Sequence, residues 1–233
     1  MPLLVCQHCT KSYGTTIALA DVNLIASAGE IVGLAGPNGA GKTTLLHSIV
    51  GIIRLDQGTI QINGLNRTSP SAKRLIGFMP DNLPRPELLT IEEMCRVNCT
   101  LFSQPFDREM IDELADVLEI RDRLREPLAG LSHGTCRKAD LMAALATRPQ
   151  ILILDEPFSG LDPLMVDRVV MLIKAHADAG GLVLLSSHDL EITAECATRV
   201  LMIQSGEVQG EFAHSESQFT LRQAFRDMIL AES

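Results

Sequence analysis

The sequence predicts an α/β fold with a core of mostly parallel sheet, an antiparallel β subdomain and an inserted lobe of helices. Apolar runs at 31–34, 151–154 and 182–185 are short and continuous, which is typical of strands covered on both faces of a parallel sheet. Between 82 and 148, apolar residues recur instead at helical spacing. The pair Asn63-Gly64 is a hairpin turn signal, so we expect antiparallel strands in the first 80 residues.

The 233 residues suit one domain that carries an insertion. We expect a single domain over 1–233, in which 1–80 and 149–233 form the core with its β subdomain and 82–148 forms the helical lobe. After Pro149, strand and helix patterns alternate again. The stretch 217–233 favours a short terminal helix.

Composition excludes several functional classes. With 20 Lys and Arg against 29 Asp and Glu, the net charge is −9 and no basic run occurs, which disfavours nucleic-acid binding. No apolar run approaches the roughly 18 residues of a membrane span, and the N-terminus lacks a secretory pattern, so we expect a cytoplasmic location. Free, buried thiols are the favoured interpretation of the cysteines, with a zinc site as the weaker alternative suggested by Cys6, His8, Cys9, Cys95 and Cys99.

The most informative stretch follows the first apolar run and reads "GPNGAGKTT". A strand, a glycine-rich loop ending in Gly-Lys-Thr and a helix-like pattern occur in the order of a P-loop, which predicts a P-loop NTPase core. Glycines let successive backbone amides turn toward phosphate oxygens, and the helix N-terminus adds partial positive charge. We expect Lys42 to reach the β- and γ-phosphates and Thr43 to hold Mg²⁺. The predicted nucleotide contacts are Gly36, Pro37, Asn38, Gly39, Ala40, Gly41, Lys42, Thr43 and Thr44.

Two acidic residues follow the apolar run 151–154 and should complete this site. Asp155 stands at the end of a predicted buried strand, where it would hold Mg²⁺, and Glu156 is placed to orient or deprotonate the attacking water. His188 follows the run 182–185 in the same way. Because the carboxyl ends of parallel strands converge at one edge of a sheet, His188 could hydrogen-bond the γ-phosphate there.

With these motifs in place, nearly the whole chain resembles the ATP-binding-cassette (ABC) ATPases. "GPNGAGKTT" is similar to the family's P-loop, "ILILDEP" to its Walker B strand and glutamate, "SGLD" at 159–162 to its D-loop and "SSHDLE" to its switch histidine. "LSHGTC" at 131–136 stands where the family has its LSGGQ signature. The resemblance implies ATP and Mg²⁺ as ligands, and an aromatic stacking role for Tyr13 on adenine.

The same resemblance implies that two cassettes close head to tail, as a homodimer or with a paired cassette, so that the signature acts in trans. Ser132 would then donate its hydroxyl to the γ-phosphate and Gly134 its amide. The sequence departs from the pattern at His133 and Thr135 in the signature, and at Asp81, where the family usually has glutamine. We expect a competent signature, and we assign Asp81 a catalytic and metal-contacting role with altered Mg²⁺ contacts.

The favoured functional interpretation is a Mg²⁺-dependent ATPase subunit that powers a membrane transporter. An integral membrane permease would bind near the helical lobe and the segment after Asp81, which would place the chain on the inner face of the membrane. Asp81 and His133 favour an exporter of the kind that moves drugs, antibiotics, peptides, lipids or polysaccharides. The alternative is a soluble ABC ATPase, for example in iron–sulfur assembly, without a permease. A P-loop kinase or GTPase is disfavoured because the chain lacks an Asn-Lys-x-Asp guanine motif and the signature would have no role.

Overall fold

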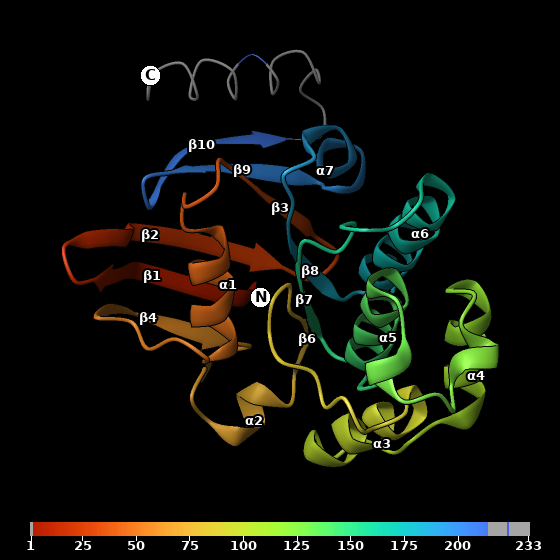
Figure 1. Cartoon of the computed structure of the whole chain (residues 1–233). Coiled ribbons are helices and arrows are strands. Elements are labelled where there is room, and N and C mark those ends of the chain that lie inside the picture. The colour runs from red at the N-terminus through yellow and green to blue at the C-terminus, as the bar shows by residue number, and fades with distance from the viewer. Residues whose placement is uncertain (1, 214–222, 224–233) are drawn as a thin grey trace.

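The computed structural model describes residues 2–213 and Gln223, which form two β-sheets with helices packed around them (Figure 1). The α/β prediction, with a mostly parallel core and an antiparallel β subdomain, is confirmed. Apart from Gln223, the terminal helix predicted over 217–233 lies outside the described residues. No helix in the described part of the chain has the length and apolar character needed to cross a membrane.

The smaller sheet is antiparallel and has the order β2-β1-β4-β5. Asn63 and Gly64 connect its last two strands with φ of 48° and 75°, which is the positive-φ geometry of a tight hairpin turn, so the turn prediction is confirmed. The four strands are β1 (Pro2–Tyr13), β2 (Thr16–Ser27), β4 (Gln57–Ile62) and β5 (Leu65–Asn66).

The larger sheet has the order β10-β9-β3-β8-β7-β6, and its strands are parallel except for β10 at one edge. The three apolar runs of the sequence form its central strands, which therefore end together at one edge of the sheet. The six strands are β3 (Ile31–Ala35), β6 (Ile76–Met79), β7 (Ile151–Asp155), β8 (Leu182–Ser186), β9 (Arg199–Gln204) and β10 (Glu207–Ala213).

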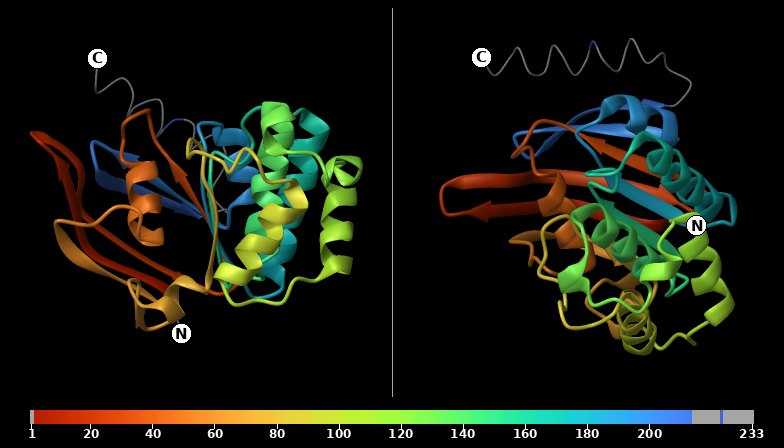
Figure 2. Two further views of the ribbon diagram at one scale, coloured as in Figure 1. Left: turned by 60° about the horizontal axis from the view of Figure 1, so that its bottom comes forward. Right: turned by 45° about the vertical axis from the view of Figure 1, so that its right-hand side comes forward.

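Both faces of the larger sheet are covered, which explains why its strands are apolar at every position. In β7, Ile151 and Ile153 pack into the core shared with α1 (Lys42–Val50) and the smaller sheet. Leu152 and Leu154 point the other way, into the core formed with the helical lobe and the helices after β7. Figure 2 shows the same layers, with the yellow, green and teal helices on one side of the larger sheet and the smaller sheet with α1 (orange) on the other. The cysteines of the described residues, all six of the chain, are buried.

The helical lobe leaves the sheet after β6 and returns to it at β7, and these two strands are neighbours. Each of its helices begins at a side-chain cap, namely Thr90, Asp107 and Ser132, as the polar residues ahead of apolar periodicity would favour. The division of the chain at 82 and 148 stays a prediction. The lobe contains α3 (Ile91–Leu101), α4 (Arg108–Val117), the 3₁₀ turns Arg121–Arg123 and Leu128–Gly130, and α5 (His133–Leu145).

Two more helices pack on the same face of the sheet as α5, whereas a short helix before β6 buries Ala72 in the core on the other face. Helix α6 (Pro163–Asp178) begins at the cap Asp162 with proline in its first turn, and Gly180, with φ of 89°, follows its end. These are the boundaries that the sequence favours. Helix α7 (Leu190–Cys196) follows β8, and the short helix α2 (Pro70–Lys73), which begins at the cap Ser69 with proline in its first turn, precedes β6.

Candidate functional site

The glycine-rich loop after β3 wraps around the N-terminus of α1. A Cβ atom at Gly36 would lie 2.1 Å from the carbonyl oxygen of Ile203, so only glycine lets the loop pass this close to β9. Gly41 has φ of 110°, and a Cβ there would lie 2.3 Å from the carbonyl oxygen of Ala18. The loop therefore directs its backbone toward the helix N-terminus because two of its glycines cannot be replaced without moving neighbouring backbone.

Lys42 folds back into the loop that precedes it. Its ammonium group donates hydrogen bonds to the carbonyl oxygens of Gly36, at 2.6 Å, and Pro37, at 3.0 Å. Burial lowers the pKa of Lys42, while the nearby carboxylates of Glu156 and Asp155 act in the opposite direction. The loop thus holds a desolvated cation where phosphate would be expected.

Asp155 lies fully buried at the end of β7 and faces the first turn of α1. Its Oδ1 accepts hydrogen bonds from the hydroxyls of Thr43, at 3.2 Å, and Ser186, at 2.5 Å. Its Oδ2 has no hydrogen-bond partner among the described residues, and the His47 ring nitrogen lies 3.9 Å away. A hydroxyl beside an unpaired carboxylate oxygen is a donor set that suits Mg²⁺.

This pair of ligands is small for a metal site formed by protein alone. Among the described residues, no three His, Cys, Asp or Glu side chains cluster as metal ligands. A Mg²⁺ ion held by Thr43 and Asp155 would therefore take its other ligands from phosphate and water, as Mg²⁺ commonly does.

Glu156 adopts an unusual backbone conformation and is fixed by its neighbours. Its φ is 52°, which is rare for a residue with a side chain, and its amide donates to the backbone oxygen and the hydroxyl of Ser186. Its Oε2 is 2.8 Å from Nδ1 of His188, whose ring is largely exposed. The two strand-end residues that the sequence assigned to catalysis therefore touch each other.

One cavity of about 340 Å³ joins most of the predicted residues. The P-loop residues from Asn38 to Thr44 line it, and Asp81, Glu156 and His188 approach from the ends of β6, β7 and β8. Ser159, in the "SGLD" segment, also lines it and had not been singled out. The lining residues are Asn38, Gly39, Ala40, Gly41, Lys42, Thr43, Thr44, Asp81, Glu156, Ser159 and His188.

Asp81 stands at the edge of this cavity and has a partner that the sequence did not indicate. Its Oδ1 lies 3.7 Å from Nη1 of Arg137, and its other oxygen accepts a short hydrogen bond from Asn82. The buried guanidinium group of Arg137 thus offsets part of the negative charge that Asp81 brings near Asp155 and Glu156. The catalytic and metal roles of Asp81 stay predictions.

Six predicted ligand residues are not among those that line the cavity. Gly36, Pro37 and Asp155 still contact P-loop side chains, through Lys42 and Thr43. The other three are Tyr13, Ser132 and Gly134. Tyr13 ends β1, is about half exposed and lies against Lys11, whose ammonium is 5.4 Å from the ring centroid. Ser132 caps α5 by accepting a hydrogen bond from the Thr135 amide. The space for a side chain at Gly134 is limited by the same chain, since a Cβ there would lie 2.9 Å from the carbonyl oxygen of Gly160. The nucleotide-binding roles of Tyr13, Ser132 and Gly134 also stay predictions.

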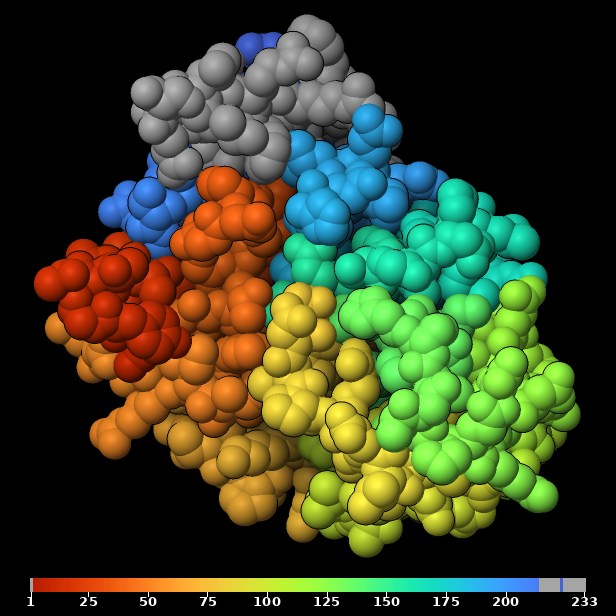
Figure 3. All heavy atoms as spheres, viewed as in Figure 1, coloured from red at the N-terminus to blue at the C-terminus, as the bar shows by residue number. Residues whose placement is uncertain are grey.

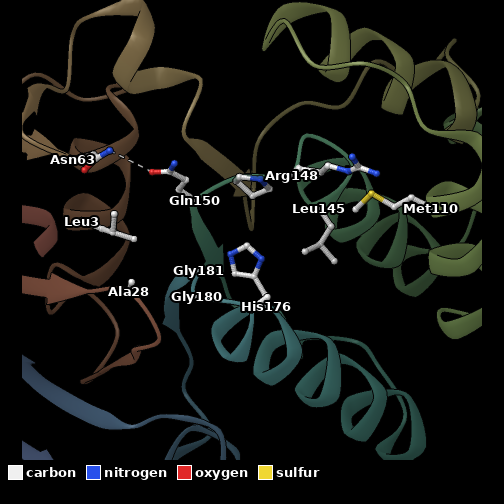
Figure 4. A pocket seen from close by; sticks show the side chains of 12 residues that line it. Leu3, Ala28, Asn63, Met110, Leu145, Arg148, Gln150, His176, Gly180 and Gly181 are labelled. Atoms are coloured by element: carbon white, nitrogen blue, oxygen red, sulfur yellow. Dashed lines mark hydrogen bonds between the residues drawn. The ribbon is translucent and has the colours of Figure 1, made fainter. Parts of the chain in front are cut away.

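A larger cavity, of about 610 Å³, lies at the opposite end of the strands (Figure 4). Gln150 and Gly181, which line it, precede β7 and β8, whereas the P-loop cavity lies beyond the carboxyl ends of those strands. His176 points into it from α6, and burial lowers the pKa of this histidine. Because ligands of open α/β sheets bind at the carboxyl ends of the strands, size alone does not make this cavity the nucleotide site.

Sequence reasoning missed Ser186 and Arg137. Ser186 is the first polar residue after the apolar run 182–185. The same position after the run was used to assign a role to His188 but not to Ser186. Arg137 is a charged residue in the mostly buried part of α5, from Cys136 to Leu145. A charged residue among buried neighbours indicates a buried, paired cation.

Comparisons with known proteins agree with this geometry. The family described as ABC transporter matches residues 19–159. The lipopolysaccharide export system ATP-binding protein LptB of Haemophilus influenzae is 35% identical over 219 residues, covering 89% of each chain. The sulfate/thiosulfate import ATP-binding protein CysA of Synechocystis is 31% identical over 210 residues, covering 88% of this chain and 59% of that protein.

Solved structures give the same result. The ATP-binding subunit of an ABC transporter superposes with a TM-score of 0.86 at 28% identity, covering 99% of this chain and 98% of the other. A dimeric post-hydrolysis state of the cassette MJ0796, bound to ADP and Pi, superposes with a TM-score of 0.83 at 24% identity, which shows the shared fold, and covers 92% and 100%. With its P-loop, strand-end carboxylates and fold in place, the chain belongs to the ABC transporter family and is an ATP-binding cassette that hydrolyses ATP.

Proposed function

We propose that this cassette powers an exporter in the membrane by closing head to tail with a second cassette around ATP. The observation that carries the proposal is a groove between the segment after β6 and the helical lobe. This groove has a volume of about 270 Å³ and runs beside the nucleotide cavity, which Asp81 lines. In Figure 3 the segment after β6 (yellow) lies at the surface between α1 (orange) and α5 (green).

The groove has the chemistry of a docking site for a protein helix or loop. Its walls include Phe78, Leu83, Met94 and Phe102, and one end carries the ion pair of Arg85 with Asp140, whose side chains lie 2.7 Å apart. An apolar groove with one fixed charged group suits an amphipathic segment of a partner. A permease seated here would touch the same segment that carries Asp81, which supports coupling between partner and nucleotide.

The geometry of the P-loop cavity supports the proposed catalytic assignments. The loop amides and Lys42 would bind the triphosphate, and Glu156 would orient and deprotonate the attacking water while His188 holds its carboxylate. Thr43 and Asp155 would hold Mg²⁺, which when bound would supply positive charge to neutralise the negative charge that develops on the phosphates. The unpaired Oδ2 of Asp155 supports this assignment, because a buried carboxylate oxygen without a partner is costly.

The positions of Ser132 and Gly134 support closure with a second cassette. Both lie at the N-terminus of α5, outside the cavity that contains Lys42 and Glu156 of the same chain. A second copy would present these groups to the first copy's ATP, and its helix N-terminus would favour the γ-phosphate. Ser132→Ala should then abolish ATP hydrolysis while ATP still binds the isolated chain, whereas loss of binding to the isolated chain would contradict a role in trans.

Export rather than import is supported by LptB, whose name places it in lipopolysaccharide export. CysA, an importer by name, is also related, so direction needs its own experiment. The test uses vesicles that contain the purified complex of cassette and permease, with the cassette facing outward. ATP supplied outside should drive lipopolysaccharide away from the cassette side of the membrane. Sulfate movement toward the cassette side without lipopolysaccharide release would contradict the proposal.

The permease itself can be tested by co-purification. The tagged chain, extracted from membranes in detergent, should bring down a polytopic membrane protein, and Leu83→Glu in the groove should prevent this while ATP binding persists. Leu164→Glu, at an exposed position of α6 outside the groove, is the matched control and should keep the complex. A soluble complex that forms without detergent would support the soluble ATPase instead.

A further inference from the structure

A fully buried arginine joins the helical lobe to the catalytic edge of the sheet. Arg137 lies in the second turn of α5 and is the largest fully buried side chain described. Its Nη1 donates to the backbone oxygens of Pro80, at 2.5 Å, and Asp81, at 3.4 Å. Its Nη2 donates to the backbone oxygens of Asp155, at 2.7 Å, and Glu156, at 2.5 Å.

This arrangement uses the planar fork of the guanidinium group. The two nitrogens hold two chain segments, one after β6 and one after β7, which are neighbours in the sheet but are separated in sequence by the whole helical lobe. A lysine ammonium at the same place is a single point and could not span both segments. The cation faces backbone carbonyls at short range, and its nearest carboxylate oxygen, on Asp81, is 3.7 Å away.

The contact with Glu156 bears on the chemistry. Glu156 has φ of 52°, and such a conformation persists only when its surroundings fix it. Ser186 fixes its amide, and Arg137 fixes its carbonyl. Hydrogen bonds thus hold both the amide and the carbonyl of Glu156, which orients the carboxylate that contacts His188.

We infer that Arg137 is a positioning residue for ATP hydrolysis, which fixes Glu156 and Asp81 relative to the signature helix α5. A displacement of α5, which begins with the signature residues, then moves the carboxylate that orients water and the segment that carries Asp81 as one unit. This inference rests on the ATPase activity of the cassette and not on the proposed permease. If the permease proposal fails, the inference about Arg137 still stands, and the reverse also holds.

The test compares Arg137→Lys and Arg137→Met with Lys138→Met in the purified full-length chain. Lys138 is the next residue of α5 and is partly exposed, so it is the matched control. We expect both Arg137 variants to lower kcat about 10- to 100-fold, as small misplacements of catalytic groups do, with KM for ATP within about threefold of native. Lys138→Met should keep native kcat. Native kcat in Arg137→Lys would overturn the inference, since charge alone would then suffice.

Two readouts separate positioning from general damage to the fold. ATP binding in EDTA should be unchanged in Arg137→Lys, and hydrogen exchange should speed up at the Glu156 amide but not in the β3 strand. If ATP binding falls in proportion to kcat, or if exchange rises across the whole chain, Arg137 is only a structural residue and the inference fails. Should Arg137→Met not fold, Arg137→Lys carries the test alone.

Discussion

Ser186 offers a sharp test of the proposed Mg²⁺ site, because its contact with Asp155 was found from the structure alone. Its hydroxyl donates to Oδ1 of Asp155 at 2.5 Å, and both side chains are buried. Ser186→Ala removes this donor and leaves Thr43 as the remaining hydroxyl on that oxygen. A hydrogen bond to a charged, buried group contributes about 1.5–3 kcal/mol, so the melting temperature of a chain of this size should fall by about 3–12 °C.

The same substitution should weaken Mg²⁺ binding. Ser186 orients the carboxylate from outside the proposed metal site, and the loss of such a partner typically costs about 10- to 100-fold in metal affinity. The Mg²⁺ concentration for half-maximal ATP hydrolysis should rise accordingly, whereas ATP binding in EDTA should stay native. The amide of Glu156 keeps the backbone oxygen of Ser186 as a partner at 3.1 Å, so its own position should change little.

Ser187→Ala is the matched control. The neighbouring hydroxyl is also buried, but it accepts a hydrogen bond from the backbone amide of Asp189 and does not touch Asp155. We expect a loss of about 1 kcal/mol, close to 2–4 °C, with an unchanged Mg²⁺ titration. Equal stability losses in the two variants, together with an unshifted Mg²⁺ titration for Ser186→Ala, would refute the reasoning.

Three further predictions follow from single positions. Gly41→Ala should abolish binding of a fluorescent ATP analogue, because its Cβ would lie 2.3 Å from the Ala18 carbonyl oxygen, whereas Gly130→Ala, with open space around it, should bind normally; native affinity in Gly41→Ala would contradict this. Asp81→Gln should change the Mg²⁺ dependence of hydrolysis, since it removes a charge that faces both the cavity and a buried guanidinium, and identical titration curves would count against it. Burial lowers the folded-state pKa of His176 below 6.5, so the unfolded chain takes up the proton first and stability should fall as pH drops from about 6.5 through the folded pKa. The urea midpoint of the native chain should therefore drop more between pH 7 and pH 5 than that of His176→Gln, and parallel drops would refute the assignment.

The sheet and the nucleotide cavity could be predicted because their physical signals are local. A strand that is covered on both faces must be apolar at every position, and the strands at 31–35, 151–155 and 182–186 were visible for that reason. The P-loop was visible because close backbone approach requires glycine, as the contacts of Gly36 and Gly41 show. Strand ends then brought Glu156 and His188 together, since parallel strands finish at one edge.

The other contacts could not be predicted because they depend on which strands are neighbours. Ser186 meets Asp155 only because β7 and β8 pair in register at these two residues. Gly134 had a sequence-based explanation through phosphate, but its close contact with the Gly160 carbonyl lies within the same chain. Neither a periodicity nor a motif in the sequence predicts this contact. A large substituent at Gly134 would therefore disturb local packing as well as the predicted nucleotide contact.

The pairing of β6 with β7 explains how a lobe of helices can act on chemistry that it does not contain. The chain leaves the sheet after Met79, at the catalytic edge, and returns at Ile151, which pairs with Ile76 at the other end of the same two strands. A partner that displaces the lobe must therefore strain either the segment after Met79 or the guanidinium fork of Arg137, which joins the carboxyl ends of β6 and β7 to α5. The backbone oxygens that Arg137 holds belong to residues whose side chains line or underlie the nucleotide cavity, so the strain would reach Asp81, Asp155 and Glu156 without any contact between partner and ATP.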